Sequence, residues 1–585
     1  MIFALLSWNE ISDFIRIQAE QVFLTDLLLW QWISLLLCAL LCVSPRIVPA
    51  RLLTSIRLRL HALAQNRRRA VLICSLFPMV VRVGLLPSVP VKPPSVHDEF
   101  SLLLMADTFV SGRLTNPTHP YWTHFETIHV IQKPTYASMY PPALGLFLAI
   151  GQMLHNPWVG VLLSVGVMCG AICWMLQAWA PPAWAFGGAL ATALQIGIGG
   201  YWMNSYFGGV LPALAGALLL GAIPRFLRKP EWVSASIFAI SIVLLVNMRP
   251  FEGTVLAGVC VALAAFWRWK AVLGKPEIRW PIFTPAIVIL LLGGCFTAYY
   301  SWRVTGNPTK IPYVVNRETY GWPENLAILP PEHVTHRHEI LKSMHRMELG
   351  NREAYASFRN MVWNWSARCV LIWEFYVGPA LTLPLLMLPW TIRNPRLRAL
   401  FYVVLLMWCL NLLQLMAYPQ HVAPVAAIFC LLLVSGIRHL YVMARRAGIL
   451  PERVVASLVL CLVCSAGFKL YGESFHFRMS FWEHPYFPHR DARATIVSKL
   501  GQMPGKHLVF VHYMLQHSPH EEWVYNAANI DGSKIVWANS MSSQEDAELC
   551  KYFHDRQAWV VEPDTDPSGF LPFSYRSHIR YGPFQ

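Results

Sequence analysis

The segment 96–100 sets two adjacent carboxylates, Asp98 and Glu99, directly after a hydrophobic stretch. Ionised side chains at a membrane boundary seldom serve packing alone. A positioned carboxylate can act as a general base toward a hydroxyl group, and a phosphate leaving group needs a cation such as Lys or Arg. Because His97 and Lys133 belong to the same polar region, the residue types favour proton transfer beside a phosphate.

The two acids also open a predicted helix over residues 98–111, where the helix dipole favours negative charge. N-capping by Asp98 is therefore the structural alternative to catalysis. The other polar residues of the same loop argue for chemistry, since they include a histidine, a lone lysine and several tyrosines. We predict that His97, Tyr136 and Tyr140 contact substrate.

The elements that hold these residues are predicted to cross a membrane. Of the 585 residues, 55% are hydrophobic and only 14% are charged, which is too little polar surface for one soluble globule. A span needs roughly 20 apolar residues, and such runs number about twelve. They lie near residues 27–45, 70–89, 157–178, 183–200, 209–226, 232–248, 251–268, 281–301, 370–389, 398–417, 421–438 and 453–469.

The positions of arginine and lysine indicate which loops face the cytoplasm, because short cytoplasmic loops retain positive charge. The stretch after the first span is rich in arginine, and no acid occurs between Asp26 and Asp98. Alternation between such basic loops places both termini and the acid pair outside, which in a bacterium is the periplasm. The net charge of +15 is explained by topology and anionic lipid headgroups, so we expect membrane lipids as partners and no nucleic acid.

Three polar regions lie outside the predicted spans, at about 90–156, 302–369 and 470–585. The apolar stretch 140–155 is too short to cross and is predicted to be an interfacial or re-entrant helix. The last region alternates strand-like and helical runs and predicts a small α/β domain. Its strands are expected at 507–513, 522–526, 534–539 and 558–562, with a helix near 543–556.

The acid pair Asp98-Glu99, followed by the turn Lys133-Pro134 and a short apolar helix, resembles the GT-C superfamily of lipid-linked-sugar glycosyltransferases. Within it the chain is most similar to the bacterial branch related to protein O-mannosyltransferases and aminoarabinose transferases. The hydropathy pattern extends the resemblance over residues 70–470. The expected organisation is an N-terminal extra span with a basic loop (1–69), a GT-C-like polytopic α-helical membrane domain (70–470) and a periplasmic α/β domain (471–585).

The resemblance implies a polyprenyl-phosphate sugar donor that enters from the bilayer and a lipid or glycan acceptor that approaches from the periplasm. It also implies that Asp98 is the catalytic base, that Glu99 assists or orients, and that Lys133 holds the donor phosphate. Aminoarabinose transferases carry a metal-binding Glu before this Lys-Pro, whereas the present chain has Gln132. Neutral Gln is a poor ligand for a divalent cation, so no metal ligand is assigned and no cofactor is certain.

Further candidates lie at the outer ends of later spans. Arg249 and Glu252 stand between apolar runs, so they should face protein or a cavity. Either they form an internal salt bridge that fixes helix packing, or Arg249 is a second phosphate anchor. Asn204, Tyr206, Glu252 and His421 are predicted substrate contacts, with plain capping or an interfacial position as the alternative for His421.

Two groups of histidines could suggest metal binding, but their surroundings favour other roles. His333, His336, His338 and His345 lack the neighbouring acids of a zinc protease motif, and we predict an amphipathic surface helix there. In the C-terminal region, His512, His517 and His520 with Glu521 could bind a metal or an acceptor, but the pattern favours a solvated loop.

These observations predict an integral membrane glycosyltransferase of the bacterial inner membrane that transfers a sugar to a periplasmic hydroxyl of a cell-envelope glycan or lipid. A transporter or flippase of lipid-linked saccharide is the competing class, in which Arg249 and Glu252 line a path. A glycan polymerase or ligase that uses the same donors is a third alternative, because both chemistries need an external base and cations for phosphate.

Overall fold

The computed structural model describes residues 26–43, 49–272, 280–321 and 334–573, apart from 354, 356, 416, 417, 473, 475–490 and 516. The chain divides into two compact units. The helical unit comprises residues 1–91, 161–295 and 354–485, and the mixed unit comprises 92–160, 296–353 and 486–585. His333 and the first 25 residues lie outside the described part.

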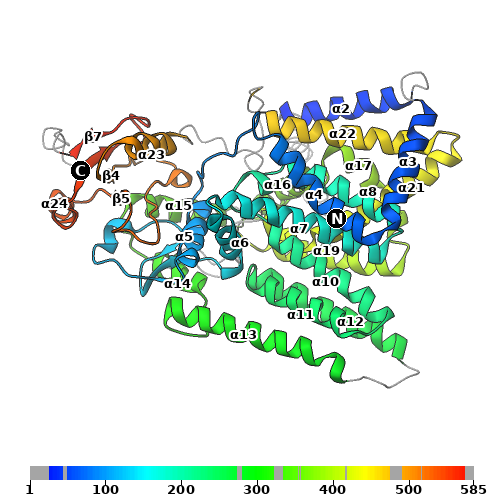
Figure 1. Ribbon diagram of the computed structural model, residues 1–585, viewed down its shortest axis with the longest axis horizontal. Helices are drawn as coiled ribbons and strands as arrows, with labels where there is room; N and C mark the ends of the chain where they lie inside the picture. The colour runs from blue at the N-terminus through cyan, green and yellow to red at the C-terminus, as the bar shows by residue number, and fades with distance from the viewer. Residues whose placement is uncertain are drawn as a thin grey trace. The chain divides into compact units, whose positions relative to one another are not determined.

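The helical unit is built from helices, most of them apolar (Figure 1). They are α2 (Asp26–Val43), α3 (Ala50–Gln65), α4 (Arg67–Gly84), most of α7 (Pro157–Trp179), α8 (Pro182–Thr192), α10 (Val210–Arg228), α11 (Trp232–Val246), α12 (Pro250–Val272), the first half of α13 (Thr284–Thr305), α16 (Phe358–Tyr376), α17 (Gly378–Leu386), α18 (Leu388–Thr391), α19 (Pro395–Leu412), α21 (Ala426–Arg446) and α22 (Pro451–Tyr471). Short turns of helix occur at η3 (Ala193–Ile198), α9 (Tyr201–Asn204), η4 (Trp280–Ile282), α20 (Pro419–Val422) and η5 (Ala423–Val425).

Seven helices of the described residues are long and apolar enough to cross a membrane, and a bent pair would make eight. Four more apolar helices are shorter, at Leu28–Leu40, Pro142–Met153, Pro182–Ile198 and Trp232–Val246. The predicted polytopic helical architecture is therefore present, while the count of twelve spans is not confirmed. The predicted span at 70–89 forms α4, which falls outside both groups.

The bent pair is α16 and α17, whose axes meet at 101°. Gly378 lies at the break with φ of +60°, a left-handed conformation that glycine adopts without steric cost. The break leaves carbonyl groups without helical partners. The Gln195 side chain of η3 donates to the carbonyls of Glu374 and Phe375, at 3.4 and 3.1 Å.

The mixed unit begins with α5 (His97–Val110), which confirms the helix predicted over 98–111. A small antiparallel sheet follows in the order β1-β3-β2, formed by Asn116–Pro117, Thr135–Ser138 and Val130–Ile131. In its register, Val130 pairs with Ser138 and Ile131 with Ala137. The remaining elements of this part are η2 (Trp122–Phe125), α6 (Pro142–Met153), α14 (Pro312–Tyr320) and α15 (Glu339–Glu353).

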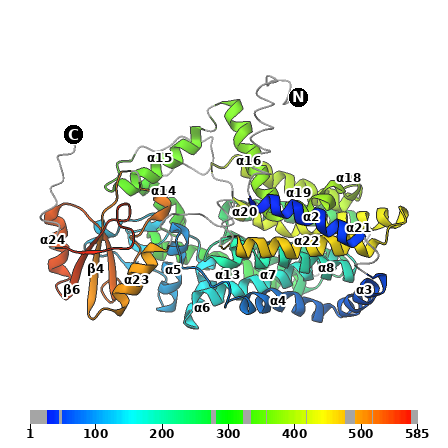
Figure 2. The ribbon, with the colours of Figure 1, turned by 90° about the horizontal axis from the view of Figure 1, so that it is seen from above.

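The C-terminal part of the mixed unit is the predicted α/β fold, with a sheet in the order β5-β4-β6-β7 (Figures 1 and 2). Its strands are β4 (Lys506–Val511), β5 (Ile535–Asn539), β6 (Arg556–Val561) and β7 (Leu571–Pro572), with α23 (Ala492–Gln502), η6 (Pro519–Glu521) and α24 (Ser543–Tyr552). Alternate residues of β4 enter two cores: Leu508 packs with Leu549 of α24, and Val509 packs with Ile496 of α23. The two helices therefore cover opposite faces of the sheet.

The strand predicted at 522–526 is wrong. The Arg493 guanidinium donates to the carbonyls of Trp523 and Tyr525, at 2.9 and 3.0 Å. The Asn526 side chain bonds to both backbone groups of Trp537, at 2.8 Å each. Side chains thus satisfy backbone groups that a neighbouring strand would otherwise pair.

Candidate functional site

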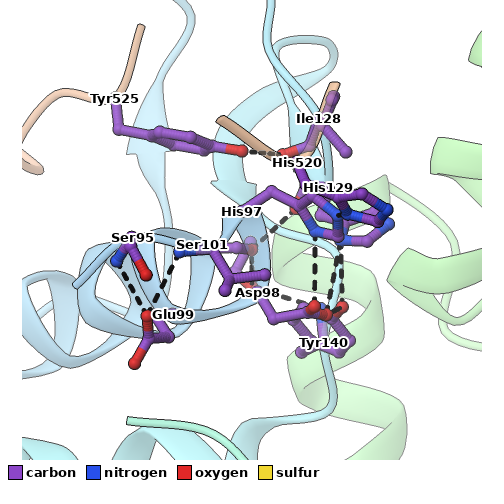
Figure 3. A network of polar contacts seen from close by, with 12 residues as sticks. Ser95, His97, Asp98, Glu99, Ser101, Ile128, His129, Tyr140, His520 and Tyr525 are labelled. Atoms are coloured by element: carbon purple, nitrogen blue, oxygen red, sulfur yellow. Dashed lines mark hydrogen bonds and ion pairs between the residues drawn. The ribbon is translucent and has the colours of Figure 1, made fainter. Parts of the chain in front are cut away.

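The two adjacent acids of α5 point in different directions, since neighbouring helical residues differ by about 100°. Glu99 is 2% exposed, and its Oε2 accepts the backbone N–H groups of Ser95 and Val96, at 2.8 and 3.2 Å (Figure 3). This contact caps the helix, which is the role that the sequence alternative assigned to Asp98. Glu99 therefore binds backbone N–H groups, whereas Asp98 contacts a cluster of side chains.

Asp98 is held by three side chains from separate segments (Figure 3). The Tyr140 hydroxyl donates to its Oδ1. The Nδ1 atom of His97 lies 3.3 Å from Oδ2, and the Nδ1 atom of His129 lies 3.5 Å from Oδ1. The two Nδ1 atoms are 3.1 Å apart, and the Tyr140 oxygen is 3.0 Å from His129 Nδ1. The structure thus brings together three predicted residues, His97, Asp98 and Tyr140.

His129 is a cluster member that the sequence did not reveal. Its φ of 61° places it in the left-handed region, where a residue with a Cβ pays roughly 1 kcal/mol or more. Ser101 Oγ donates to its carbonyl at 2.7 Å and lies 2.8 Å from Ser138 Oγ, and the Met139 N–H donates to the same carbonyl at 3.2 Å. These contacts hold a strained backbone, which is typical of functional positions.

His520 is a further member of the cluster; from the sequence it was an alternative metal or acceptor ligand, and a solvated loop was favoured. It comes from η6 in the C-terminal part, and its Nδ1 lies 3.2 Å from His97 Nε2. The two rings stack at 5.3 Å with an interplanar angle of 24°. The prediction of a solvated histidine loop is therefore wrong here: His520 is partly buried, and His517 is 4% exposed and lies 2.8 Å from an Asp564 oxygen.

The pKa shifts of Asp98 and His97 favour different charge states for the two side chains. Burial opposes ionisation of Asp98, but His97, His129 and the Tyr140 hydroxyl outweigh it and hold the pKa of the carboxyl below its usual range. Burial lowers the pKa of His97 well below 6.5, against the attraction of Asp98. An ionised Asp98 beside a neutral His97 is therefore the state near neutral pH.

Glu348 of α15 is a further acid in this electrostatic environment. Burial raises the pKa of Glu348 to about 7, and Asp98 raises it further while His129 and Arg317 oppose the shift. A carboxyl that titrates near neutral pH can hold a proton in reserve. No sequence pattern singled out Glu348, because it lies in the segment predicted as a surface helix.

The cluster has the donor set of a metal site. One atom each of His97, Asp98 and His129 lies within 4.8 Å of the others. The two Nδ1 atoms lie 3.1 Å apart, and each approaches a different oxygen of Asp98, His97 at 3.3 Å from Oδ2 and His129 at 3.5 Å from Oδ1. Two imidazoles and a carboxylate suit Zn²⁺ and related cations. These residues therefore fit a divalent metal, although no metal ligand was predicted because Gln132 replaces a metal-binding Glu.

Gln132 itself is buried, and its side-chain amide donates to the Phe125 carbonyl. Lys133, a predicted donor-phosphate ligand, lies at the tip of the β2–β3 hairpin with its Nζ 4.3 Å from the centre of the Trp122 ring. At about 3.3 Å per residue, the tip is roughly 13 Å along the strand from His129. No hydrogen bond or ion pair joins Lys133 to Asp98 among the described residues.

Tyr136 is also separate from the cluster, because it belongs to a hydrophobic core with Phe100 and Leu104. Its hydroxyl donates to the Asn526 carbonyl at 2.9 Å. Tyr136 is only 4% exposed. Its surroundings therefore do not favour the predicted contact with substrate. The alternation of the β3 strand turns it into the core.

In the helical unit, Arg249 and Glu252 do not form the salt bridge that the sequence offered as an alternative. No ion pair joins the two side chains, both of which lie among the described residues. Glu252 Oε1 instead accepts from the Gln414 amide at 3.2 Å. Arg249 is half-buried, and its Nε has no hydrogen-bond partner in the part of the chain that the structure describes.

The other outer-end candidates have structural partners. Asn204 Oδ1 accepts from Arg82 Nε at 2.8 Å, and Arg82, which the sequence did not single out, is fully buried. His421 Nδ1 accepts from the Tyr418 backbone N–H at 3.1 Å, which is the capping alternative. Tyr206 is half-buried.

Comparison with known proteins finds no matching family model and no curated relative. Among solved structures, the oligosaccharyltransferase of Archaeoglobus fulgidus in complex with Zn and sulfate has a TM-score of 0.46 and 11% identity, over 84% of this chain and 67% of that one. The archaeal oligosaccharyltransferase from the same organism, in complex with an inhibitory peptide and a dolichol-phosphate, has a TM-score of 0.44 and 11% identity, over 85% and 69%.

Proposed function

We propose that the chain is an integral membrane glycosyltransferase of the bacterial inner membrane. It transfers a sugar from a polyprenyl-phosphate carrier to a periplasmic hydroxyl of a cell-envelope glycan or lipid, with inversion at the anomeric carbon. The observation that carries the proposal is the Asp98 carboxylate, which Tyr140, His97 and His129 hold in a chain that also has helices long enough to cross a membrane. A fixed, ionised carboxylate outside the spans is what deprotonation of an acceptor hydroxyl requires.

In the proposed reaction, Asp98 accepts the proton of the acceptor hydroxyl while that oxygen attacks the anomeric carbon and the carrier phosphate leaves. The low pKa of Asp98 keeps it ionised but makes it a weak proton acceptor. The proton therefore moves late, when the new carbon–oxygen bond has already acidified the hydroxyl. A divalent cation bound by His97, Asp98 and His129 would supply positive charge that lowers the pKa of a nearby hydroxyl.

Tyr140 orients Asp98, because one hydroxyl contacts both the carboxylate and His129. For the donor phosphate we propose Arg249, whose Nε has no partner among the described residues, since a guanidinium pairs well with phosphate oxygens. Lys133, exposed over Trp122, stays a weaker proposal for the same role. Asn204, Tyr206, Glu252 and His421 stay proposals as sugar or acceptor contacts.

The test is mass spectrometry of envelope glycans and polyprenyl-linked sugars in the native host. A deletion strain is complemented with wild type, Asp98→Asn or the control Asp555→Asn, all expressed at equal level. Asp555 pairs with Lys506 at 2.9 Å on the surface, with a side chain 48% exposed, and such pairs contribute little. The proposal expects Asp98→Asn to lose one sugar and accumulate its lipid donor, as the deletion does, while Asp555→Asn complements.

Full complementation by Asp98→Asn would contradict the base role and favour the transporter or flippase alternative. Loss of polymer length or of a whole glycan block, with the single sugar retained, would instead identify a polymerase or ligase.

A further inference from the structure

The C-terminal α/β part holds His520 rigidly against the acid–histidine cluster. His520 lies in η6, between Pro519 and Glu521, which are both buried. The Glu521 carbonyl is 3.1 Å from His517 Nε2, and the other ring nitrogen of His517 is 2.8 Å from Asp564 Oδ1. A histidine bonded through both nitrogens fixes the turn that presents His520.

The same part of the chain also contacts the two segments that carry the other cluster residues. The Tyr525 hydroxyl donates at 3.1 Å to the carbonyl of Ile128, the residue before His129 (Figure 3). The Tyr525 ring stacks on Phe100 of α5 with centroids 4.6 Å apart, and the Arg493 guanidinium lies 4.5 Å from the Phe100 ring centre. The position of His520 relative to His97 is therefore set by several independent contacts.

The proton of His97 has two possible places, with different consequences. A neutral imidazole carries one proton. If it lies on Nδ1, His97 donates toward Asp98 and cannot bind a cation there. If it lies on Nε2, Nδ1 offers its lone pair beside Asp98 and His129, and the proton needs an acceptor on the other side. Among the described residues, that acceptor is His520 Nδ1.

We propose that His520 is a positioning residue: its Nδ1 accepts the Nε2–H of His97 and thereby selects the His97 tautomer that binds a divalent cation of the Zn²⁺ class together with Asp98 and His129. Metal-binding histidines generally donate their second ring N–H to such a partner, and loss of the partner typically weakens metal affinity 10–100-fold.

Two substitutions separate hydrogen bonding from packing. His520→Asn keeps an acceptor, because Asn Oδ1 stands as many bonds from Cβ as His Nδ1 does, but it removes the ring. His520→Phe keeps a ring that can stack on His97 but removes the acceptor. His554→Ala is the matched control, because this histidine is exposed on the same C-terminal part.

The measurement is calorimetric titration of the full-length protein in detergent with Zn²⁺, and separately with Mg²⁺. We expect wild type, His520→Asn and His554→Ala to bind one Zn²⁺ with affinities within about threefold of one another, and His520→Phe to bind about 10–100-fold more weakly. Mg²⁺ should bind weakly to all four, since it prefers oxygen ligands.

The proposal is overturned if wild type binds no Zn²⁺, if His520→Phe binds as wild type does, or if His520→Asn is the weaker variant, which would make stacking the important contact. The proposal deepens the proposed function and rests on the same cluster. The titration contains neither donor nor acceptor, so its failure leaves the transferase proposal standing, and failure of the host experiment leaves the metal result standing.

Discussion

The acid–histidine cluster of the mixed unit and the Arg249 region of the helical unit both contain ionised groups, but these groups are paired differently. Asp98 is contacted by Tyr140, His97 and His129. Arg249 has an Nε without a partner among the described residues, while Glu252 bonds to an amide. A carboxylate held on several sides is ready for chemistry without rearrangement, whereas a half-buried guanidinium without a carboxylate is suited to an anionic ligand. This difference is the basis for proposing proton transfer at Asp98 and phosphate binding at Arg249.

After substitution of Asp98 itself, substitution of Arg249 is expected to have the largest effect on sugar transfer. Arg249→Ala should lower kcat/KM for the lipid donor about 10²-fold, because a charged partner of the phosphate is lost. Arg249→Lys should recover part of this loss, since it keeps the charge and loses the planar donor pair. The measurement is the rate of sugar transfer at varied donor concentration. An unchanged donor KM in Arg249→Ala would remove Arg249 from phosphate binding.

Tyr140→Phe is expected to have a smaller effect, confined to the cluster. Loss of a hydrogen bond to a charged carboxylate costs about 1.5–3 kcal/mol, which corresponds to roughly 10- to 100-fold in kcat. Because Tyr140 orients Asp98, the donor KM should stay unchanged. Steady-state kinetics test this, and a change in donor KM alone would place Tyr140 in donor binding.

Glu99 provides a prediction about stability rather than chemistry. Glu99→Ala should lower the free energy of unfolding by about 1 kcal/mol through loss of the helix cap, while Glu99→Gln, which retains an acceptor oxygen, should cost less. Thermal unfolding in detergent measures the difference. Loss of transfer in Glu99→Gln as severe as in Asp98→Asn would show that the acids share the chemistry.

Glu348 provides a prediction about the pH dependence of stability. Its folded-state pKa of about 7 lies above the ordinary 4.5, so the native state binds more protons than the unfolded state between these values. Stability from this group is therefore present at low pH and is lost as pH rises from about 4.5 to 7. Glu348→Gln should flatten this decline in Tm. Equal slopes in the two proteins would mean that Glu348 ionises normally.

Local patterns predicted the parts of the molecule that depend on neighbouring residues. The helix at 98–111, the strands β4, β5 and β6, and the apolar helices follow from periodicity and composition. Of the site, His97, Asp98 and Tyr140 were predicted because they share one loop. His129 was missed and His520 was assigned to a solvated loop, because they are 32 and 423 positions from His97. No sequence spacing encodes a contact that tertiary packing makes.

The acid pair shows the limit most clearly. Two adjacent carboxylates look equivalent in sequence, but the helix turns one toward the preceding backbone N–H groups and the other toward two histidines. Lys133 was associated with Asp98 because both lie in one loop, and the hairpin carries it away toward Trp122. Residues in one loop are thus reasonable candidates for a shared site, but the local backbone geometry determines which of their side chains come into contact.

The most direct test of the central claim separates donor binding from transfer in one variant. The lipid-linked sugar that accumulates in the Asp98→Asn strain is purified and added to full-length wild type and Asp98→Asn in detergent, and both its binding and its single-turnover transfer are measured. We predict a donor Kd within about threefold of wild type and transfer slower by about 10²- to 10⁴-fold. Transfer at the wild-type rate, or loss of binding that accounts for the whole defect, would contradict the assignment of Asp98 as the catalytic base.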